Sequence, residues 1–531
     1  MSRMASVEVV NGEPRLRVGQ ATYKTVIVSN MLTIRPTTVK LLREFMTAGG
    51  KVVFAGELPA YVNAVRSDEP RMLAEQGITV PYDEAALVAA VRDASSSFVS
   101  VTGENGESER AVFVQVRRDF GGDGYAAVLL NTDRNQPREN LTLSLRVPRG
   151  YTVQEWDLEK GERYDASAIA GEAGDMLYIS LDLPAAGTRC FVLTREQETL
   201  APVTEFETTA SETLTGEFPY AADEPNVCVL DFCRWRWKGG EWSDEGEALW
   251  IDRAVRSNIG IEWRGGSMLQ PWYAKLNDNK AYGELQLSYE FYVDTLPMGD
   301  VFLAGERPEL NHYRINGFDL TCDDPNDFWI DDCFKRMKIP AEAIRMGRNE
   351  VTVDVTFRRT TNIEALYLVG IFGVKLDGHT RTVTEVPPVI GCDNYAAYNL
   401  PFFTGNMTIT LTAEDYKPLL GDAADTADRI VLTPKDFTGG CVKVTAGGKT
   451  TVLGWDPYEA DVTEAYRQGL PISVTVVGVR TNLFGPLHQV PKPAGSCGPG
   501  SFVTRGDAWT DDYSLLSSGL RGFTFKAQVK A

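Results

Sequence analysis

The 531-residue chain has few of the side chains that build metal sites, and it has no long apolar run. It contains three histidines, and its eight cysteines are scattered without a CxxC pair. Zinc sites and disulfide frameworks both need closely spaced ligands or paired cysteines, so we expect neither. No segment approaches the roughly 20 apolar residues of a membrane span, and the first residues lack the apolar core of a signal peptide. These absences predict free thiols and a cytoplasmic protein that does not enter a membrane.

The chain is also poor in positive charge. Its 53 Lys and Arg residues face 73 Asp and Glu residues, which gives a net charge of −20. Nucleic acids and anionic membranes bind clustered Lys and Arg, so this composition argues against both as partners. The length exceeds what one hydrophobic core supports and predicts roughly three or four domains.

The first 95 residues alternate between strand and helix patterns. The runs TVIVSN and KVVFAGELP are β-branched and apolar, and between them PTTVKLLREFMTAGG has apolar residues at helical spacing. Strand, helix and strand in this order predict parallel strands joined by a right-handed crossover. Neither strand is followed by the Gly-rich turn of a nucleotide site, so we expect residues 1–95 to form a structural α/β, flavodoxin-like module.

The pattern changes near Ser96 to alternating strands separated by Gly, Asn and Pro, which predicts an antiparallel β-sandwich over residues 96–198. The polar, Thr-rich stretch EQETLAPVTEFETTASET that follows is typical of a linker. Six of the ten tryptophans then fall between Trp235 and Trp272. Within this region EGEALWIDRAVRSNIG predicts one helix, because apolar residues recur on one side of it.

An internal repeat spans the second half of the chain. EAIRMG and EAYRQG, at 342–347 and 464–469, match as EAxRxG with an offset of 122 residues. Other pairs recur in the same order at offsets of 120 to 126: Gly283 and Gly405, Trp329 and Trp455, Arg359 and Arg480, and Asn362 and Asn482. The repeat predicts two copies of one jelly-roll domain, with Arg359 equivalent to Arg480 and Trp329 equivalent to Trp455.

We therefore predict a multidomain, mainly β fold: a small α/β module, an antiparallel β-sandwich and two jelly-roll domains. The jelly-roll domains are expected at 199–385, where the Trp-rich segment opens the domain, and at 386–531. In the second copy RTNLFGPLH, Arg480–His488, ends the long strand. Since the motif occurs twice, we interpret it as a structural corner rather than a catalytic loop; its residues are Arg480, Asn482, Trp455 and Arg359.

The structural interpretation makes a specific prediction for this corner. Arg480 should be largely buried and bonded to backbone carbonyls or to an acid of its own domain, such as Asp456 or Asp461. His488 has no histidine or cysteine near it in the sequence. We expect it to be a hydrogen-bonded surface or core side chain.

Exposed tryptophan and tyrosine rings can stack on the C–H faces of sugars, so the Trp-rich region supplies candidate carbohydrate platforms. Trp263, Trp272 and Tyr273 lie in a Gly- and Pro-broken stretch, and Trp235 and Trp237 alternate on one face of a strand. The alternative for each is an ordinary core position.

Acidic residues cluster in TCDDPNDFWIDDC. Asp323, Asp324 and Asp327 could supply oxygen ligands to a structural calcium ion, although the spacing is not that of an EF-hand. The alternative is a solvated acidic loop. No other cofactor is expected.

The segment GWDPYEADVTEAYRQGLPISVTVVGVRTNLFGPLH resembles the sugar-binding jelly roll of the glycoside hydrolase family 2 type. YKTVIVSNMLTIRPTTVKLLREFMTAGGKVVFAGE is similar to the α/β module that follows the catalytic barrel in large bacterial β-galactosidase-like and rhamnosidase-like enzymes. The stretches VLLNTDRN and VQEWDLEKGE are similar to the β-domain after that module. The order of modules thus resembles the C-terminal half of such glycoside hydrolases.

In those enzymes the catalytic carboxylates sit on a (β/α)8 barrel of about 250 residues that precedes the α/β module. Only about 20 residues precede it here, so the resemblance assigns no catalytic residue to this chain. Three functions stay open: a non-catalytic accessory portion or subunit that supports a catalytic barrel and binds carbohydrate, a stand-alone carbohydrate-binding protein, and a self-sufficient hydrolase with an unrecognised carboxylate pair. The expected partners are carbohydrate and either a barrel subunit or further copies of the chain.

Overall fold

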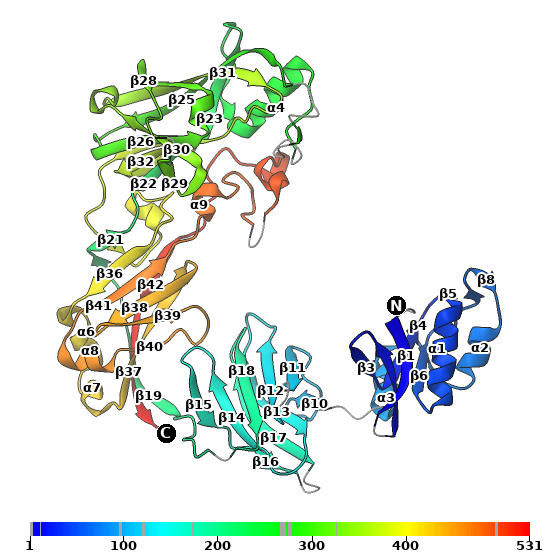
Figure 1. Cartoon of the computed structure of the whole chain (residues 1–531). Helices are drawn as coiled ribbons and strands as arrows, with labels where there is room; N and C mark the ends of the chain where they lie inside the picture. Colours follow the sequence, from blue (N-terminus) through cyan, green and yellow to red (C-terminus); the bar gives the residue numbers. More distant parts are fainter. Residues whose placement is uncertain are drawn as a thin grey trace. The chain divides into compact units, whose positions relative to one another are not determined.

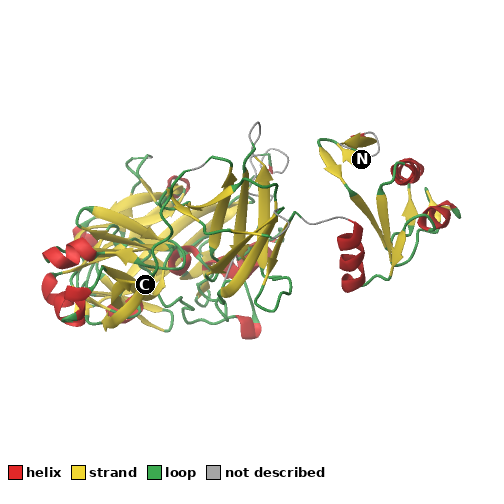
Figure 2. Cartoon of the chain, turned by 90° about the horizontal axis from the view of Figure 1, so that it is seen from below, coloured by secondary structure: helices red, strands yellow, loops and turns green. Residues whose placement is uncertain are grey.

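The computed structural model describes residues 4–10, 12–94, 98–118, 123–171, 175–196, 198–265, 272–273, 279–324, 326–493 and 497–531. The chain forms two compact units, residues 1–203 and 204–531 (Figure 1). Strands dominate both units, with short helices at their edges (Figure 2). The predicted multidomain, mainly β fold class is confirmed. Among the described helices, none is long and apolar enough to cross a membrane.

The first unit begins with the predicted α/β module. Its sheet has three parallel strands, β4 (Thr25–Ser29), β6 (Lys51–Ala55) and β9 (Ile78–Val80). Helix α1 (Pro36–Thr47) starts with a proline, which costs no hydrogen bond there, and its apolar spacing buries three side chains against the sheet. The remaining elements are β1 (Ala5–Val10), β2 (Glu13–Val18), β3 (Ala21–Tyr23), β5 (Thr33–Ile34), β7 (Tyr61–Val62), β8 (Val65–Arg66), α2 (Glu69–Ala74) and α3 (Glu84–Ala94).

The rest of the first unit is the predicted antiparallel sandwich. Its two sheets have the orders β10-β13-β17-β16 and β11-β12-β18-β14-β15. Leucine, valine and isoleucine side chains that alternate along these strands form its core. The strands are β10 (Val99–Thr102), β11 (Val112–Arg118), β12 (Tyr125–Asn131), β13 (Arg138–Arg146), β14 (Thr152–Asp157), β15 (Glu162–Asp165), β16 (Ile169–Ala170), β17 (Met176–Leu183) and β18 (Thr188–Thr194).

The second unit contains two jelly rolls. In the first, a sheet with the order β24-β23-β25-β31-β27-β28 faces a sheet with the order β22-β32-β26-β30-β29, and helix α4 (Ala248–Ile259) follows β24. Its strands are β22 (Asn226–Leu230), β23 (Phe232–Trp237), β24 (Gly246–Glu247), β25 (Ala281–Val293), β26 (Met298–Glu306), β27 (His312–Ile315), β28 (Phe318–Leu320), β29 (Phe328–Trp329), β30 (Asp331–Ile339), β31 (Gly347–Arg358), β32 (Leu366–Ile371), β33 (Gly373–Asp377) and β34 (Thr380–Thr384).

The second jelly roll pairs a sheet of order β21-β36-β41-β38-β39 with one of order β19-β42-β37-β40, around its own core. Its elements are β19 (Phe206–Leu214), β20 (Glu217–Phe218), β21 (Tyr220–Ala222), β35 (Ile390–Gly391), β36 (Met407–Leu411), α6 (Ala413–Leu420), α7 (Ala423–Thr426), β37 (Arg429–Thr438), β38 (Cys441–Ala446), β39 (Lys449–Leu453), β40 (Ala460–Asp461), α8 (Thr463–Gln468), β41 (Ile472–Val477) and β42 (Gly519–Lys530).

The internal repeat is confirmed by strand register. Leu287 of β25 faces Val353 of β31 in the first jelly roll, and Ile409 of β36 faces Val474 of β41 in the second. Adding the offsets of 122 and 121 residues to the first pair gives the second pair. A one-residue slip would move every side chain to the opposite face of the sheet, so the shared register places the same positions in both cores.

Two expectations about this region were wrong. Trp329 lies in β29 and is buried, whereas Trp455 lies in the loop after β39 and is 56% exposed, so the two are not equivalent. The Thr-rich stretch predicted as a linker contains β19, which pairs with β42. Threonine is β-branched and fits a half-exposed strand, and the tertiary partner β42 decides the outcome.

The strands of the two jelly rolls are interleaved along the chain. β19 and β21 precede the strands of the first jelly roll, yet they pair with β42 and β36 of the second. After β41 the chain returns to the first jelly roll before it enters β42. We call residues 480–493 and 497–516 the strap. The strap includes α9 (Thr481–Phe484) and lies beside the first jelly roll (Figure 1). The predicted domain boundaries themselves stay predictions.

Candidate functional site

The strap begins at the predicted corner, where Arg480 has a different partner from the one expected. Its guanidinium donates to both carboxylate oxygens of Glu224, at 2.6 and 2.5 Å, and to the Thr404 hydroxyl at 3.0 Å. Asp456 and Asp461 are not its partners, and 36% of the Arg480 side chain is exposed, so it is less buried than expected. Glu224 follows β21, which the interleaving brings into the second jelly roll.

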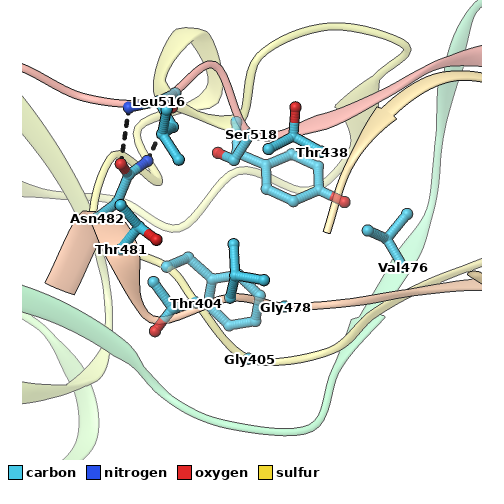
Figure 3. Close-up of a pocket in the computed structure, with 12 residues that line it drawn as sticks. Thr404, Gly405, Thr438, Val476, Gly478, Thr481, Asn482, Leu516 and Ser518 are labelled. Carbon is cyan, nitrogen blue, oxygen red and sulfur yellow. Dashed lines mark hydrogen bonds between the residues drawn. The ribbon is translucent and has the colours of Figure 1, made fainter. Parts of the chain in front are cut away.

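Asn482 fixes the next turn of the strap. Its side-chain amide donates to the carbonyl of Leu516, and its carbonyl accepts from the N–H of Leu516, both at 2.8 Å (Figure 3). The cavity beside these residues measures about 20 Å³, enough for one water molecule and too small for a sugar. This geometry supports a structural role for the corner.

Beyond the corner, the strap packs against the first jelly roll. Leu483 and Leu487 are buried in its core. The ring of Phe484 stacks on Phe334 at a centroid distance of 5.3 Å and contacts Trp329 edge-on. Apolar burial of this kind holds the two jelly rolls together.

His488 is a buried, hydrogen-bonded side chain, as expected, and it belongs to a charged cluster. Its Nε2 lies 3.0 Å from Asp231 Oδ2, and its Nδ1 lies 3.0 Å from the carbonyl of Thr510. Arg381 lies 3.4 Å from the same carboxylate, and the Tyr513 hydroxyl donates to it at 2.6 Å. Burial acts to raise the pKa of Asp231, but the hydrogen bond from His488 and the nearby positive charges outweigh it and lower that pKa.

Because the Asp231 carboxylate is ionised and a carbonyl oxygen can only accept, both ring nitrogens of His488 face acceptors. Both ring nitrogens of His488 are therefore engaged by oxygen atoms of the fold. Asp231 thus contacts His488, Arg381 and Tyr513 at once. This cluster fixes the strap against the turn between β22 and β23.

A pocket of about 500 Å³ opens beside this cluster. Segments from three distant parts of the chain line it: the start of α4, the turn before β34, and the strap. Aromatic rings and ionisable groups make up most of the lining. These side chains are Phe232, Glu245, Glu247, Trp250, His379, Arg505, Trp509 and Asp511.

The aromatic rings of the pocket are held in place by contacts with each other and with the cluster. Trp509 meets Trp250 edge-to-face at 6.5 Å and lies 5.1 Å from the His488 ring. Phe232 stacks on His379 at 4.3 Å. The Trp509 indole N–H donates to Asp511 at 2.9 Å. Such packing limits side-chain motion, so the lining is largely formed before any ligand arrives.

One carboxyl group of the pocket has an altered acidity. Burial raises the pKa of Glu247 to about 8, although its side chain accepts from the N–H of Trp250 at the start of α4. Glu247 is therefore mostly protonated near neutral pH. The more exposed Glu245 lies 3.2 Å from His379 Nε2.

The structure separates the predicted aromatic platforms into two groups. Trp235 and Trp237 are half-buried and pack against the core, and Tyr273 is buried with its hydroxyl bonded to Glu262. Trp263 and Trp272 are exposed, at 48% and 50%. Trp263 lies beside the pocket, since the Arg505 guanidinium is 6.0 Å from its ring.

Sequence reasoning missed Trp250 and Trp509, the two tryptophans that line the pocket. Trp250 appeared only within a predicted helix, and Trp509 stands alone in DAWTDD. A high density of tryptophans in one segment does not indicate which indole rings the strap brings together from distant parts of the chain.

The acidic candidates for calcium form local contacts. Asp323 accepts from Thr321, Asp324 accepts from the N–H of Asn326, and Asp327 pairs with Arg336. Among the described residues, no three Asp, Glu, His or Cys side chains converge as a metal site would require. The calcium site stays a prediction.

The comparisons with known proteins give weak structural similarity to glycoside hydrolases. No family model and no curated protein matches the sequence. A rhamnosidase from Novosphingobium sp. PP1Y matches with 16% identity and a TM-score of 0.30, over 69% of this chain and 35% of that one. An exo-carrageenase GH42 from Bacteroides ovatus matches with 11% identity and a TM-score of 0.22, over 33% and 22%.

A β-D-mannosidase from Dictyoglomus thermophilum matches with 10% identity and a TM-score of 0.18, over 51% of this chain and 31% of that one. The matched region spans about a third or less of the length of these three proteins.

Proposed function

We propose that the chain is a non-catalytic, carbohydrate-binding accessory portion of a glycoside hydrolase, and that the pocket beside α4 is its binding site. The observation that carries the proposal is the lining of the pocket, in which the indoles of Trp250 and Trp509 stand beside charged side chains. Sugars present apolar C–H faces and rings of hydroxyl groups, so they are bound by aromatic rings combined with planar polar side chains.

The volume and rigidity of the pocket support this proposal. About 500 Å³ falls within the range of small-molecule sites. Asp511 and Glu245 offer carboxylate oxygens to sugar hydroxyls, and Arg505 offers N–H donors. The resemblance of the module order to the C-terminal half of large glycoside hydrolases supports the accessory role.

Affinity electrophoresis on a panel of polysaccharides tests the binding site. The wild-type chain should be retarded by at least one polysaccharide, and Trp509→Ala should lose about tenfold in affinity, since stacked rings contribute on the order of 1–2 kcal/mol. Asp511→Asn tests the same site with less risk to packing. Trp455→Ala removes an exposed tryptophan from a loop of the second jelly roll and should bind normally. Equal binding by the wild type and both pocket variants would contradict the proposal.

A self-sufficient hydrolase is the second candidate function, and the raised pKa of Glu247 favours it. A protonated Glu247 beside the carboxylates of Glu245 and Asp511 has the residue types of a general acid and its partner. Turnover of aryl glycosides decides between the two. We expect none above a heat-treated control, whereas turnover that Glu247→Gln removes would favour the hydrolase.

A further inference from the structure

Two guanidinium groups contact the tryptophans beside the pocket, where Arg505 is part of the lining and Arg253 lies behind Trp250, outside the lining. The Arg505 guanidinium is 4.2 Å from the centre of the Trp250 ring. The Arg253 guanidinium is 4.9 Å from Trp250 and 4.8 Å from Trp263. Cation–π contacts with the two indoles therefore position both cations, Arg253 from within α4 and Arg505 from the strap.

Neither guanidinium has a carboxylate partner among the described residues, in salt bridges or hydrogen bonds. The neighbouring arginines differ, because Arg256 on the same helix pairs with Asp252 and Arg264 pairs with Glu364. Burial and then the positive charge of Arg505 lower the pKa of Arg253, whereas the charges of Asp252 and Glu247 act in the opposite direction. Asp252 and Glu247 act on Arg253 through space, but among the described residues neither forms a salt bridge or a hydrogen bond with Arg253 or Arg505.

The acids of the pocket are engaged elsewhere. Glu245 pairs with His379, and Asp511 accepts from the Trp509 indole. Glu247 is buried at the start of α4 and accepts from a backbone N–H there. These contacts leave the Arg253 and Arg505 end of the pocket as the place where a negative group can bind.

We propose that the pocket binds an acidic saccharide, with the carboxylate or sulfate ester of the sugar held by Arg505 and Arg253. The inference rests on the proposed function and specifies the class of sugar. Arginine is suited to this role because its planar N–H groups bind carboxylate and sulfate oxygens in pairs. The ring of the same saccharide packs against Trp509, whose indole is fixed by Asp511 and His488.

Affinity electrophoresis in three gels tests the inference on the full chain: polygalacturonate for carboxylates, carrageenan for sulfate esters, and neutral galactan. The wild type should be retarded by polygalacturonate, by carrageenan or by both, with weaker retardation as salt is added. Arg505→Gln should lower the affinity about tenfold, because a charge-assisted hydrogen bond is lost. Arg253→Gln, which keeps the helix, should act in the same direction.

Arg345→Gln is the matched control, since Arg345 is exposed and its side chain contacts the backbone carbonyl of Arg348. It should behave as the wild type does. If galactan retards the wild type and Arg505→Gln equally, the inference is overturned, whereas the proposed function is still supported. Retardation by an acidic polymer that Arg505→Gln and Arg253→Gln leave unchanged also overturns it, because the anion then binds elsewhere. If no gel retards the folded wild type, both the inference and the proposed function fail.

Discussion

His488 Nε2 lies 3.0 Å from Asp231 Oδ2, although the two residues are 257 positions apart in the chain. Asp231 lies between β22 and β23 of the first jelly roll, and His488 comes from the strap. Each side chain is about 5% exposed, so water does not screen the pair. The pair joins the strap to the first jelly roll and supports Trp509, whose ring lies against His488.

Removing the charge of Asp231 should strongly destabilise the second unit. Asp231→Asn leaves Arg381 as a buried cation without a counter-charge and weakens the contact with His488, a change that costs roughly 3–5 kcal/mol. Thermal unfolding and urea denaturation should both shift to milder conditions. The variant should also bind its saccharide less well while it is still folded, because the strap that carries Trp509 loosens.

The chain offers an exposed pair of the same kind as a control. His312 Nε2 lies 3.0 Å from Asp319 Oδ1, with side chains that are 50% and 67% exposed. Asp319→Asn should change stability by less than about 1 kcal/mol, since exposed ion pairs contribute little. Equal effects of Asp231→Asn and Asp319→Asn would show that burial of the cluster does not matter.

At the corner, Asn482 should contribute more to the free energy of unfolding than Arg480 does, a ranking that the sequence does not suggest. Asn482→Ala leaves the N–H and carbonyl of Leu516 unpaired next to a small cavity, which costs roughly 1–3 kcal/mol per buried group (Figure 3). Arg480→Ala removes a half-exposed pair with Glu224 and should cost about 1 kcal/mol. Urea denaturation of both variants ranks them, and a larger loss for Arg480→Ala would refute this assignment.

Much of the fold could be predicted from the sequence because its signals are local and periodic. The α/β module follows from apolar spacing in 25–55, and the register of the two jelly rolls follows from the 122-residue repeat. The equivalence of Trp329 and Trp455 failed because a matching letter at a similar offset carries no information about burial.

The candidate site could not be predicted, because segments far apart in the chain build it. The interleaving of strands brings Glu224 to Arg480, and the strap brings Trp509 and Arg505 to α4. Local periodicity does not specify such non-local pairings. The sequence did indicate that the Trp-rich region matters, and Trp250 and Trp263 come from it.

Glu247 gives the pocket a measurable dependence on pH. The carboxyl has an ordinary pKa of 4.5 in the unfolded chain, and burial raises this pKa to about 8 in the fold. Between these values the folded state holds a proton that the unfolded state has released. Stability from this group is therefore fully present below about pH 4.5, falls as the pH rises, and is lost above about pH 8.

Glu247→Gln should remove this dependence while it keeps an oxygen that accepts from the N–H of Trp250. At pH 4 the variant and the wild type should unfold at similar temperatures, because the Glu247 side chain is then neutral in the fold and largely neutral in the unfolded chain. At pH 8.5 the variant should have an unfolding temperature several degrees above that of the wild type. The folded wild type must either bury an ionised Glu247 or keep this carboxyl protonated at a pH above its pKa, and both cost free energy. Glu245→Gln, at a more exposed position of the same pocket, should show no such gain. If the unfolding temperatures of Glu247→Gln and the wild type differ by the same amount at both pH values, Glu247 ionises normally. The general-acid role considered for Glu247 would then lose its support.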